Sequence, residues 1–224
     1  MEKIEALRNT LENIAMSHAP ACLASSFGVE DMVLIDMIAR HGIPVSVFTL
    51  DTGRLPEETY QLMQKTRQRY GLEIEVYFPK AGSIEAYAER NGPNAFYDSV
   101  ELRKTCCQIR KVEPLSRALK GKGAWITGMR RQQSPTRSDL ADAVYDEDNG
   151  LHKYSPLLEW SETEVWNYIR MQNVPYNDLH DRGYPSIGCA PCTRAITRGE
   201  DIRAGRWWWE EASGRECGLH RKKA

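Results

Sequence analysis

The sequence predicts an α/β domain whose parallel, twisted sheet carries helices on both faces, followed by an irregular C-terminal segment. Short apolar segments alternate with segments of helical periodicity as far as Gly128. Strands separated by helices indicate repeated β-α-β crossovers, which build parallel sheets that are covered on both faces. Beyond Asn173 the alternation gives way to segments rich in Pro, Gly and Trp.

The expected elements follow this alternation along the chain. The strands are the short apolar segments 21–25, 44–50, 73–78 and 124–128, with a turn at 26–28 after the first. Helical spacing or a helix-start signal predicts helices over 2–16, 29–40, 55–70, about 83–89, 105–111 and 114–119, and a last helix that begins at Ser161 and ends near 171. Pro114 suits the first turn of one helix, and Ser161 with Glu164 forms a capping box that begins the last one.

Composition limits the class of protein. The 224 residues carry 30 basic and 31 acidic side chains, which gives a net charge of −1. This length suits a single domain, 1–224, and the balanced charge argues against a chain that coats nucleic acid. The charged N-terminus lacks the apolar core of a secretory signal, and no run of roughly 18 uncharged apolar residues is present to span a membrane. We therefore expect a cytoplasmic protein that binds neither membrane nor nucleic acid.

Charge is unevenly distributed along the chain. The segment 103–137 contains ten basic residues and one acidic residue, whereas 138–150 contains five acidic residues and no basic one. A solvated face is the usual explanation of such a run. Here, however, the basic segment includes a loop with Arg130, Arg131 and Arg137 directly after a predicted strand. Because parallel sheets bind ligands at the carboxyl ends of their strands, the run favours an anionic, phosphate-bearing small molecule as ligand.

The turn after the first strand has small residues that would let backbone N–H groups face an anion at the next helix N-terminus. Ser25, Ser26 and Gly28 lie there, a weak signal because many α/β domains have similar first turns. The turn contains no Lys, so it is not a Walker loop. This favours a ligand other than a triphosphate that is being cleaved.

The six cysteines divide into two pairs and two single residues. The expected cytoplasmic location argues against disulfides. Cys106 and Cys107 are adjacent, and adjacent helical residues point about 100° apart, so both face one centre only if it is wide or the helix is distorted. With Cys189 and Cys192, this spacing suits a 4Fe–4S cluster better than one tetrahedral zinc ion. Buried free thiols with a redox-active pair remain an alternative.

The two single cysteines differ in their surroundings. Cys22 lies mid-strand between apolar residues and is expected to be part of the core. Cys217 precedes a glycine near the C-terminus, and the cations close to it in sequence favour the nucleophilic thiolate. An incidental surface thiol is the alternative for Cys217.

Several motifs together resemble the adenosine 5′-phosphosulfate and 3′-phosphoadenosine 5′-phosphosulfate reductase family, from about Ala21 to His220. The most specific are the vicinal cysteines in T-C-C-x-x-R-K, the segment G-C-x-x-C-T-R and the terminal E-C-G-L-H. Further matches are L-D-T-G-R from Leu50, T-G-M-R-R-x-Q-S-x-x-R ending at Arg137, and R-A-G-R-W-W-W-E from Arg203. The four paired cysteines are typical of the cluster-containing, assimilatory adenosine 5′-phosphosulfate reductases.

The resemblance implies an adenine nucleotide alpha hydrolase-like fold and specific roles for the matching residues. It implies a 4Fe–4S cluster on Cys106, Cys107, Cys189 and Cys192, and Cys217 as the nucleophile on a mobile tail from about 200 to 224. It also implies two groups of substrate-binding residues. Those expected to hold the phosphosulfate are Lys111, Arg203, Arg206 and His220, and those expected to line the adenosine side are Ser25, Ser26, Leu50, Gly128 and Arg137.

The implied activity is thioredoxin-dependent reduction of adenosine 5′-phosphosulfate to sulfite and AMP, through an S-sulfocysteine on Cys217. The 3′-phosphorylated substrate is an alternative, and the family tends to form homo-oligomers. A nucleic-acid-thiolating ATP pyrophosphatase would share the fold but would need a Lys in the first turn. A non-catalytic iron–sulfur sensor would leave Cys217 without a role.

Overall fold

The computed structural model of the chain describes residues 2–133, 140–211 and 219. Its six-stranded sheet has the order β3-β2-β1-β4-β6-β5, and every neighbouring pair is parallel except β6 with β5. The strands are β1 (Ala21–Ser25), β2 (Val45–Leu50), β3 (Ile74–Tyr77), β4 (Ala124–Ile126), β5 (Ala143–Asp146) and β6 (Leu151–Tyr154). The predicted α/β class with a largely parallel sheet is confirmed.

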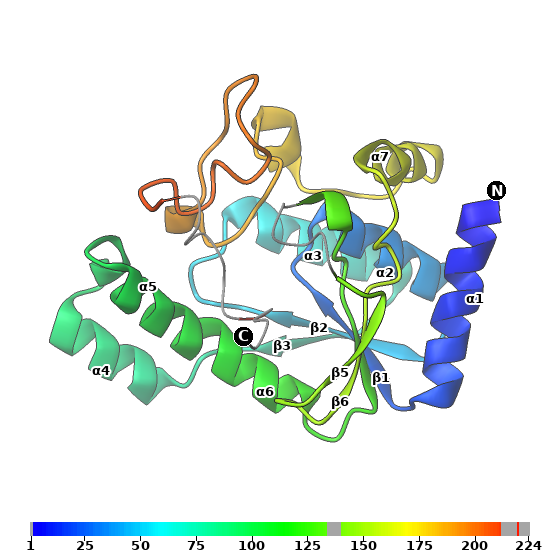
Figure 1. Cartoon of the computed structure of the whole chain (residues 1–224), viewed down its shortest axis with the longest axis horizontal. Helices are drawn as coiled ribbons and strands as arrows, with labels where there is room; N and C mark the ends of the chain where they lie inside the picture. Colours follow the sequence, from blue (N-terminus) through cyan, green and yellow to red (C-terminus); the bar gives the residue numbers. More distant parts are fainter. Residues whose placement is uncertain (1, 134–139, 212–218, 220–224) are drawn as a thin grey trace.

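Helices cover both faces of this sheet (Figure 1). They are α1 (Glu2–Ser17), α2 (Val29–His41), α3 (Glu57–Tyr70), α4 (Ala81–Asn91), α5 (Val100–Cys107), α6 (Glu113–Leu119) and α7 (Glu162–Met171). Each predicted helix is present to within a few residues, except that α5 begins earlier than expected. The predicted capping box is formed, since the Ser161 backbone N–H donates to Glu164 Oε2 over 2.8 Å and Glu164 N–H donates to Ser161 Oγ over 3.2 Å.

Alternation along the strands divides the core into two layers. In β1, Leu23 packs in the layer that contains α1 and α2, whereas Cys22 packs with Leu115 of α6 on the other face. In β4, Ile126 and Trp125 divide between the two layers in the same way. Cys22 is fully buried, as expected of a core residue, and burial raises the pKa of its thiol to about 12.

Two strands were not predicted from the sequence. The acidic segment 138–150 and the residues after it contain the hairpin of β5 and β6, which extends the sheet beyond β4. The Asp146 carbonyl accepts hydrogen bonds from Asn149 N–H (3.2 Å) and Gly150 N–H (2.7 Å), which closes the turn. Asn-Gly is a strong hairpin signal, so the sequence did contain the evidence for this element. In the described part of the chain, no helix has the length and apolar character needed to cross a membrane.

The vicinal cysteines lie where one helix becomes another. The π-helical turn η2 (Gln108–Val112) joins α5 directly to α6. Pro114 lacks an N–H, and in an α-helix its ring would collide with the carbonyl of Arg110, so a wider turn relieves the conflict. The distortion needed for Cys106 and Cys107 to share one centre is therefore present directly after them.

Candidate active site

A cleft of about 630 Å³ opens at the carboxyl ends of β1, β2 and β4. The structure brings to it these residues that the sequence nominated for substrate binding: Ser25, Ser26, Leu50, Lys111, Gly128, Arg203 and Arg206. They come from segments far apart in the chain, and their meeting place is the edge where parallel sheets bind ligands. The nominated residues Arg137, Cys217 and His220 lie outside the described part of the chain.

The turn between β1 and α2 is held by a buried carboxylate. Asp31 Oδ2 accepts hydrogen bonds from the backbone N–H of Ser26 (2.7 Å) and from its hydroxyl (2.8 Å). Burial raises the pKa of Asp31 to about 6, against the lowering effect of those hydrogen bonds. Phe27 adopts a left-handed backbone (φ 60°) and is buried, so this turn stores strain in a rigid setting.

Gly128 follows β4 at the point where α2 begins. A Cβ on Gly128 would overlap Asp31 Oδ1 and lie 2.9 Å from Glu30 Cβ. A glycine is therefore required for the end of β4 to approach the start of α2 this closely. This close approach places Gly128 in the wall of the cleft.

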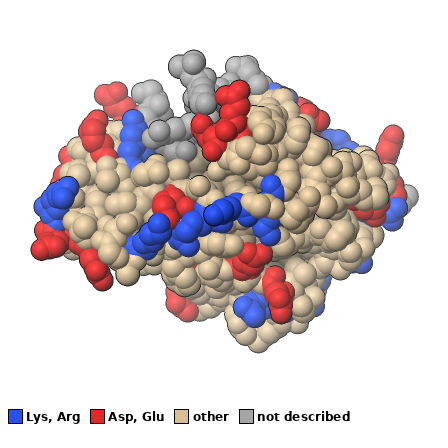
Figure 2. All heavy atoms as spheres, turned by 90° about the horizontal axis from the view of Figure 1, so that it is seen from below, with Lys and Arg blue, Asp and Glu red and all other residues tan. Residues whose placement is uncertain are grey.

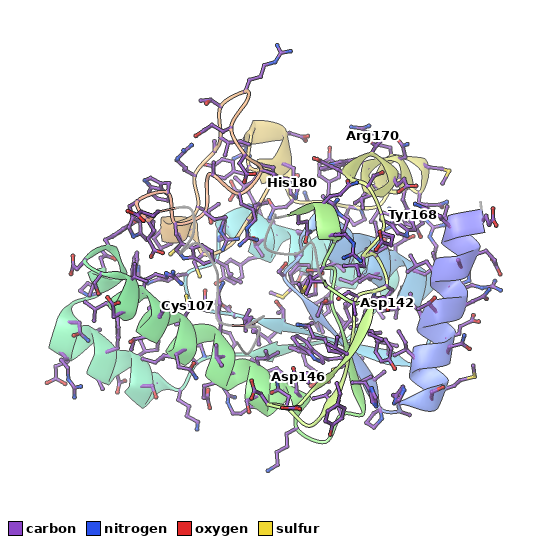
Figure 3. All side chains as sticks on the ribbon, in the orientation of Figure 1. Cys107, Asp142, Asp146, Tyr168, Arg170 and His180 are labelled. Carbon is purple, nitrogen blue, oxygen red and sulfur yellow. The ribbon has the colours of Figure 1, made fainter. Side chains whose placement is uncertain are left out.

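Charged groups of both signs line the cleft. Glu30 and Arg130 form an ion pair of 2.8 Å between Oε1 and Nε, with Arg130 almost fully buried. His180 lies in the C-terminal third, away from Cys107 (Figure 3), with its ring centroid 5.4 Å from that of Trp166. Burial lowers the pKa of His180, which favours the neutral imidazole. The sequence did not single out Glu30 or His180, because each matters only through residues distant in the chain.

The basic run 103–137 does not form one cationic patch. Several members pair with acids at the surface, including Arg117 with Glu113 (3.0 Å) and Lys122 with Glu75 (3.5 Å). The face in Figure 2 accordingly shows Lys and Arg in a band with Asp and Glu beside them. Lys111 and Arg130 are the described members that line the cleft. Among the described residues of the run, the expectation that it supplies cations to a strand-end pocket is confirmed for those two residues and not for the others.

The four paired cysteines line one small cavity beside the cleft. Cys107 on α5 (Figure 3), Cys189 and Cys192 are buried, and Cys106 is partly buried. The short helix η6 (Ala190–Cys192) follows Cys189 directly, and the Thr52 hydroxyl lies 3.3 Å from Cys189 Sγ. Burial raises the pKa of Cys192 to about 12, so the bare Cys192 thiol is protonated.

The potential metal donors that line this cavity are four cysteine sulfurs. Within the described residues, no three His, Cys, Asp or Glu side chains are close enough to hold a single metal ion. Four sulfurs from two segments nevertheless line the same cavity, and sulfur is the donor that iron–sulfur clusters use. A single zinc ion would need all four sulfurs at about 2.3 Å.

The cleft and the cysteine cavity share one residue. Lys111, in the turn η2, lines both. Arg110, next to it, donates to the Thr52 carbonyl over 2.5 Å and so joins the same turn to the segment after β2. A charge held at Lys111 is therefore next to the cysteines and next to any ligand in the cleft.

The C-terminal segment is attached beside the cysteines. Trp207 N–H donates to the Cys192 carbonyl over 3.2 Å, and Trp207 is buried. Arg206, which lines the cleft, lies over the Trp207 ring with 4.7 Å from Cζ to the centroid. Leu219, two residues after Cys217 in the chain, also lines the cleft and packs against the layer that contains Phe48 and Leu115. The described residues of this segment therefore contribute to the cleft.

The geometry is that of an α/β protein with a ligand-sized cleft at the carboxyl ends of its parallel strands and a four-cysteine cavity beside it. Residues 20–195 match the phosphoadenosine phosphosulfate reductase domain, and the chain belongs to that family. It is 56% identical to an adenosine 5′-phosphosulfate reductase of Allochromatium vinosum over 89% of this chain and 78% of the relative. It is 53% identical to one of Burkholderia cepacia, over 97% and 87%.

Solved structures support the same fold. A phosphoadenylyl-sulfate reductase of Candida auris, in complex with phosphate, has a TM-score of 0.70 at 29% identity, over 88% of this chain and 97% of that one. A yeast FAD synthetase has a TM-score of 0.58 at 18% identity, over 87% of this chain and 66% of that one, which is a likeness of fold alone. The expected adenine nucleotide alpha hydrolase-like architecture is confirmed.

Proposed function

We propose that the chain reduces adenosine 5′-phosphosulfate to sulfite and AMP, with thioredoxin as reductant, as a single-domain enzyme of assimilatory sulfate reduction. The observation that carries this proposal is that Lys111 lines both the cleft and the four-cysteine cavity. The names of the relatives from Allochromatium vinosum and Burkholderia cepacia support the substrate.

The cleft divides the substrate between two sets of residues. Lys111 and Arg206, with Arg203, supply positive charge for the phosphosulfate, and arginine binds such oxyanions in two-pronged fashion. The adenosine lies against the ends of β1, β2 and β4, which present Ser25, Ser26, Leu50 and Gly128. Arg137 and His220, outside the described residues, complete the two sets in this proposal.

The first chemical step is a displacement at sulfur. The Cys217 thiolate attacks the sulfur of the phosphosulfate, the S–O bond to the phosphate breaks, and AMP leaves with the electron pair. The cations beside the phosphate stabilise the charge that moves onto it. The product on the enzyme is S-sulfocysteine at Cys217, and no electron has yet entered from outside.

The second step is a thiol exchange. A thioredoxin thiolate attacks Cys217 Sγ, sulfite leaves with the electron pair of the S–S bond, and a mixed disulfide forms. The second thioredoxin thiol then releases the Cys217 thiolate and closes the thioredoxin disulfide, so the dithiol supplies both electrons. Trp207 and Glu210 are buried, so the segment that moves to present Cys217 is proposed to begin after them.

Cys106, Cys107, Cys189 and Cys192 would hold a 4Fe–4S cluster. When bound, such a cluster supplies a fixed charge beside Lys111 and a link between two segments, rather than electrons for the reaction. Lys111 itself orients the phosphosulfate. The burial of the cavity would keep water away from the four cysteine sulfurs that hold the cluster.

The experiment compares AMP and sulfite release from adenosine 5′-phosphosulfate by anaerobically purified enzyme and its Cys217→Ser variant, with thioredoxin present. We expect stoichiometric release by the former and none by the latter. Equal release by both would overturn the proposal and favour another enzyme class, whereas release by neither would favour a non-catalytic iron–sulfur sensor. The phosphoadenylyl-sulfate reductase from Candida auris makes the 3′-phosphorylated nucleotide the second substrate to compare.

A further inference from the structure

Arg103 is a buried guanidinium that does not itself line the cleft. Its Nε and Nη2 donate to the two carboxylate oxygens of Glu210 over 2.8 and 2.6 Å. The two side chains are only 1% and 3% exposed. Arg103 also lines the cysteine cavity and hydrogen-bonds to Cys107. A two-pronged buried pair of this kind fixes geometry, because loss of either partner leaves an uncompensated charge.

Trp207 connects Arg103 to the cleft. Arg103 Cζ lies 4.9 Å from the Trp207 ring centroid, and Arg206 Cζ lies 4.7 Å from the same centroid. The backbone of Trp207 is left-handed (φ 44°), which is an outlier for a bulky residue. Such a conformation persists only where the surroundings impose it, and here they are Arg103 and the hydrogen bond to the Cys192 carbonyl.

Arg206 is in turn confined to one position. Its Nη1 donates to the Ile187 carbonyl over 3.1 Å and lies 3.4 Å from Ser186 Oγ. A Cβ on Gly188 would overlap the Arg206 guanidinium, so only glycine admits it there. The Arg206 guanidinium therefore depends on Trp207 on one side and on the 186–188 segment on another.

We infer that Arg103 is a positioning residue that, through Trp207, sets the place of the cleft cation Arg206 and thereby the affinity for the phosphosulfate. The inference rests on the proposed function, because it takes the phosphosulfate as the ligand of Arg206. Arg103, which lies beside Cys107 on α5, would then influence substrate binding without contacting the substrate. A lysine at 103 would keep the charge but could neither form the two-pronged pair nor stack as a plane on the ring.

The test measures binding of adenosine 5′-phosphosulfate at equilibrium, in anaerobically purified holoenzyme carrying Cys217→Ser so that no turnover occurs. Into this parent we place Arg103→Lys, Arg206→Met and both together, and each protein is also analysed for iron per chain. We expect Arg103→Lys to weaken binding about tenfold, the size of one lost charged hydrogen bond. In the Arg206→Met background, Arg103→Lys should have no further effect on the dissociation constant.

One further variant, tested alone and in the Arg206→Met background, and a control exclude a merely structural role. Trp207→Leu removes the ring between the two guanidinium groups and should also be silent in the Arg206→Met background. Arg117→Lys makes the same chemical change in an exposed ion pair with Glu113 and should leave binding unchanged. If Arg103→Lys loses iron, the inference is tested instead by the double-mutant cycle of Trp207→Leu with Arg206→Met.

Additive losses in the cycles would overturn the inference. So would an unchanged dissociation constant for the Arg103 and Trp207 variants, even if their thermal midpoints fell. A parent that does not bind the nucleotide at all would instead overturn the proposed function.

Discussion

Replacing Gly128 by alanine tests the close approach that shapes the cleft. The backbone of Gly128 is not in the left-handed region, so the substitution adds a methyl group without conformational strain. That methyl group would overlap Asp31 Oδ1 and lie 2.9 Å from Glu30 Cβ. Overpacking of this kind costs about 1–3 kcal/mol, and disturbing the two Ser26–Asp31 hydrogen bonds adds about 1 kcal/mol.

We therefore expect Gly128→Ala to lower the free energy of unfolding by about 2–4 kcal/mol in urea denaturation. Weaker binding of adenosine 5′-phosphosulfate should accompany this loss, because Ser26 and Gly128 both line the cleft. Gly82→Ala is the matched control, since a Cβ on Gly82 of α4 meets nothing within 4 Å. The reasoning fails if Gly128→Ala unfolds within about 0.5 kcal/mol of the parent and binds nucleotide as tightly.

Three further substitutions test separate parts of the site. The parent should lose roughly 3 kcal/mol of unfolding free energy as the pH rises from 4 to 6, because folded Asp31, with a pKa of about 6, holds a proton that the unfolded chain releases. Asp31→Asn should abolish this loss, which urea midpoints measured across the pH range would show. An unchanged pH dependence in the variant would contradict the raised pKa. Cys192→Ser should reduce iron per chain and visible absorption after anaerobic purification, whereas Cys22→Ala in the core should retain both. Iron loss in both variants would show that the loss does not depend on the cysteine cavity. Lys111→Met should raise the dissociation constant for the nucleotide about tenfold and make that constant less dependent on salt concentration. Lys120→Met, at an exposed lysine, should leave both quantities unchanged. Equal effects of the two variants would show that only the net charge of the protein matters.

The sheet was predictable because its central strands are buried on both faces and therefore appear in the sequence as short, nearly continuous apolar runs. Leu23 and Cys22 point to opposite core layers, and the short apolar segments at β1, β2 and β4 contain this information locally. The hairpin of β5 and β6 was missed because the segment 138–150 was considered only for its charge. The Asn149-Gly150 pair was the local signal that outweighs that interpretation.

The site was predictable only where one segment carries the signal. Spacing favoured one centre for the vicinal cysteines and the second cysteine pair, whereas the π-helical turn after Cys107 was not predicted, because Pro114 indicated only the start of a helix. Arg103 and Glu210 are 107 positions apart, and Glu30 and Arg130 are 100 apart. No local periodicity encodes such pairs, so their ion pairs and the resulting geometry required the fold.

The central claim is that Cys217 takes the sulfonate from the substrate before any reductant acts. The most direct measurement mixes the anaerobically purified enzyme with adenosine 5′-phosphosulfate in the absence of thioredoxin and records the intact mass and the peptide masses. The account predicts a gain of one SO₃ group on the peptide that contains Cys217, matched by one AMP, and its loss as sulfite when thioredoxin is added. Release of sulfite without an adduct, or an adduct on another cysteine, would contradict it.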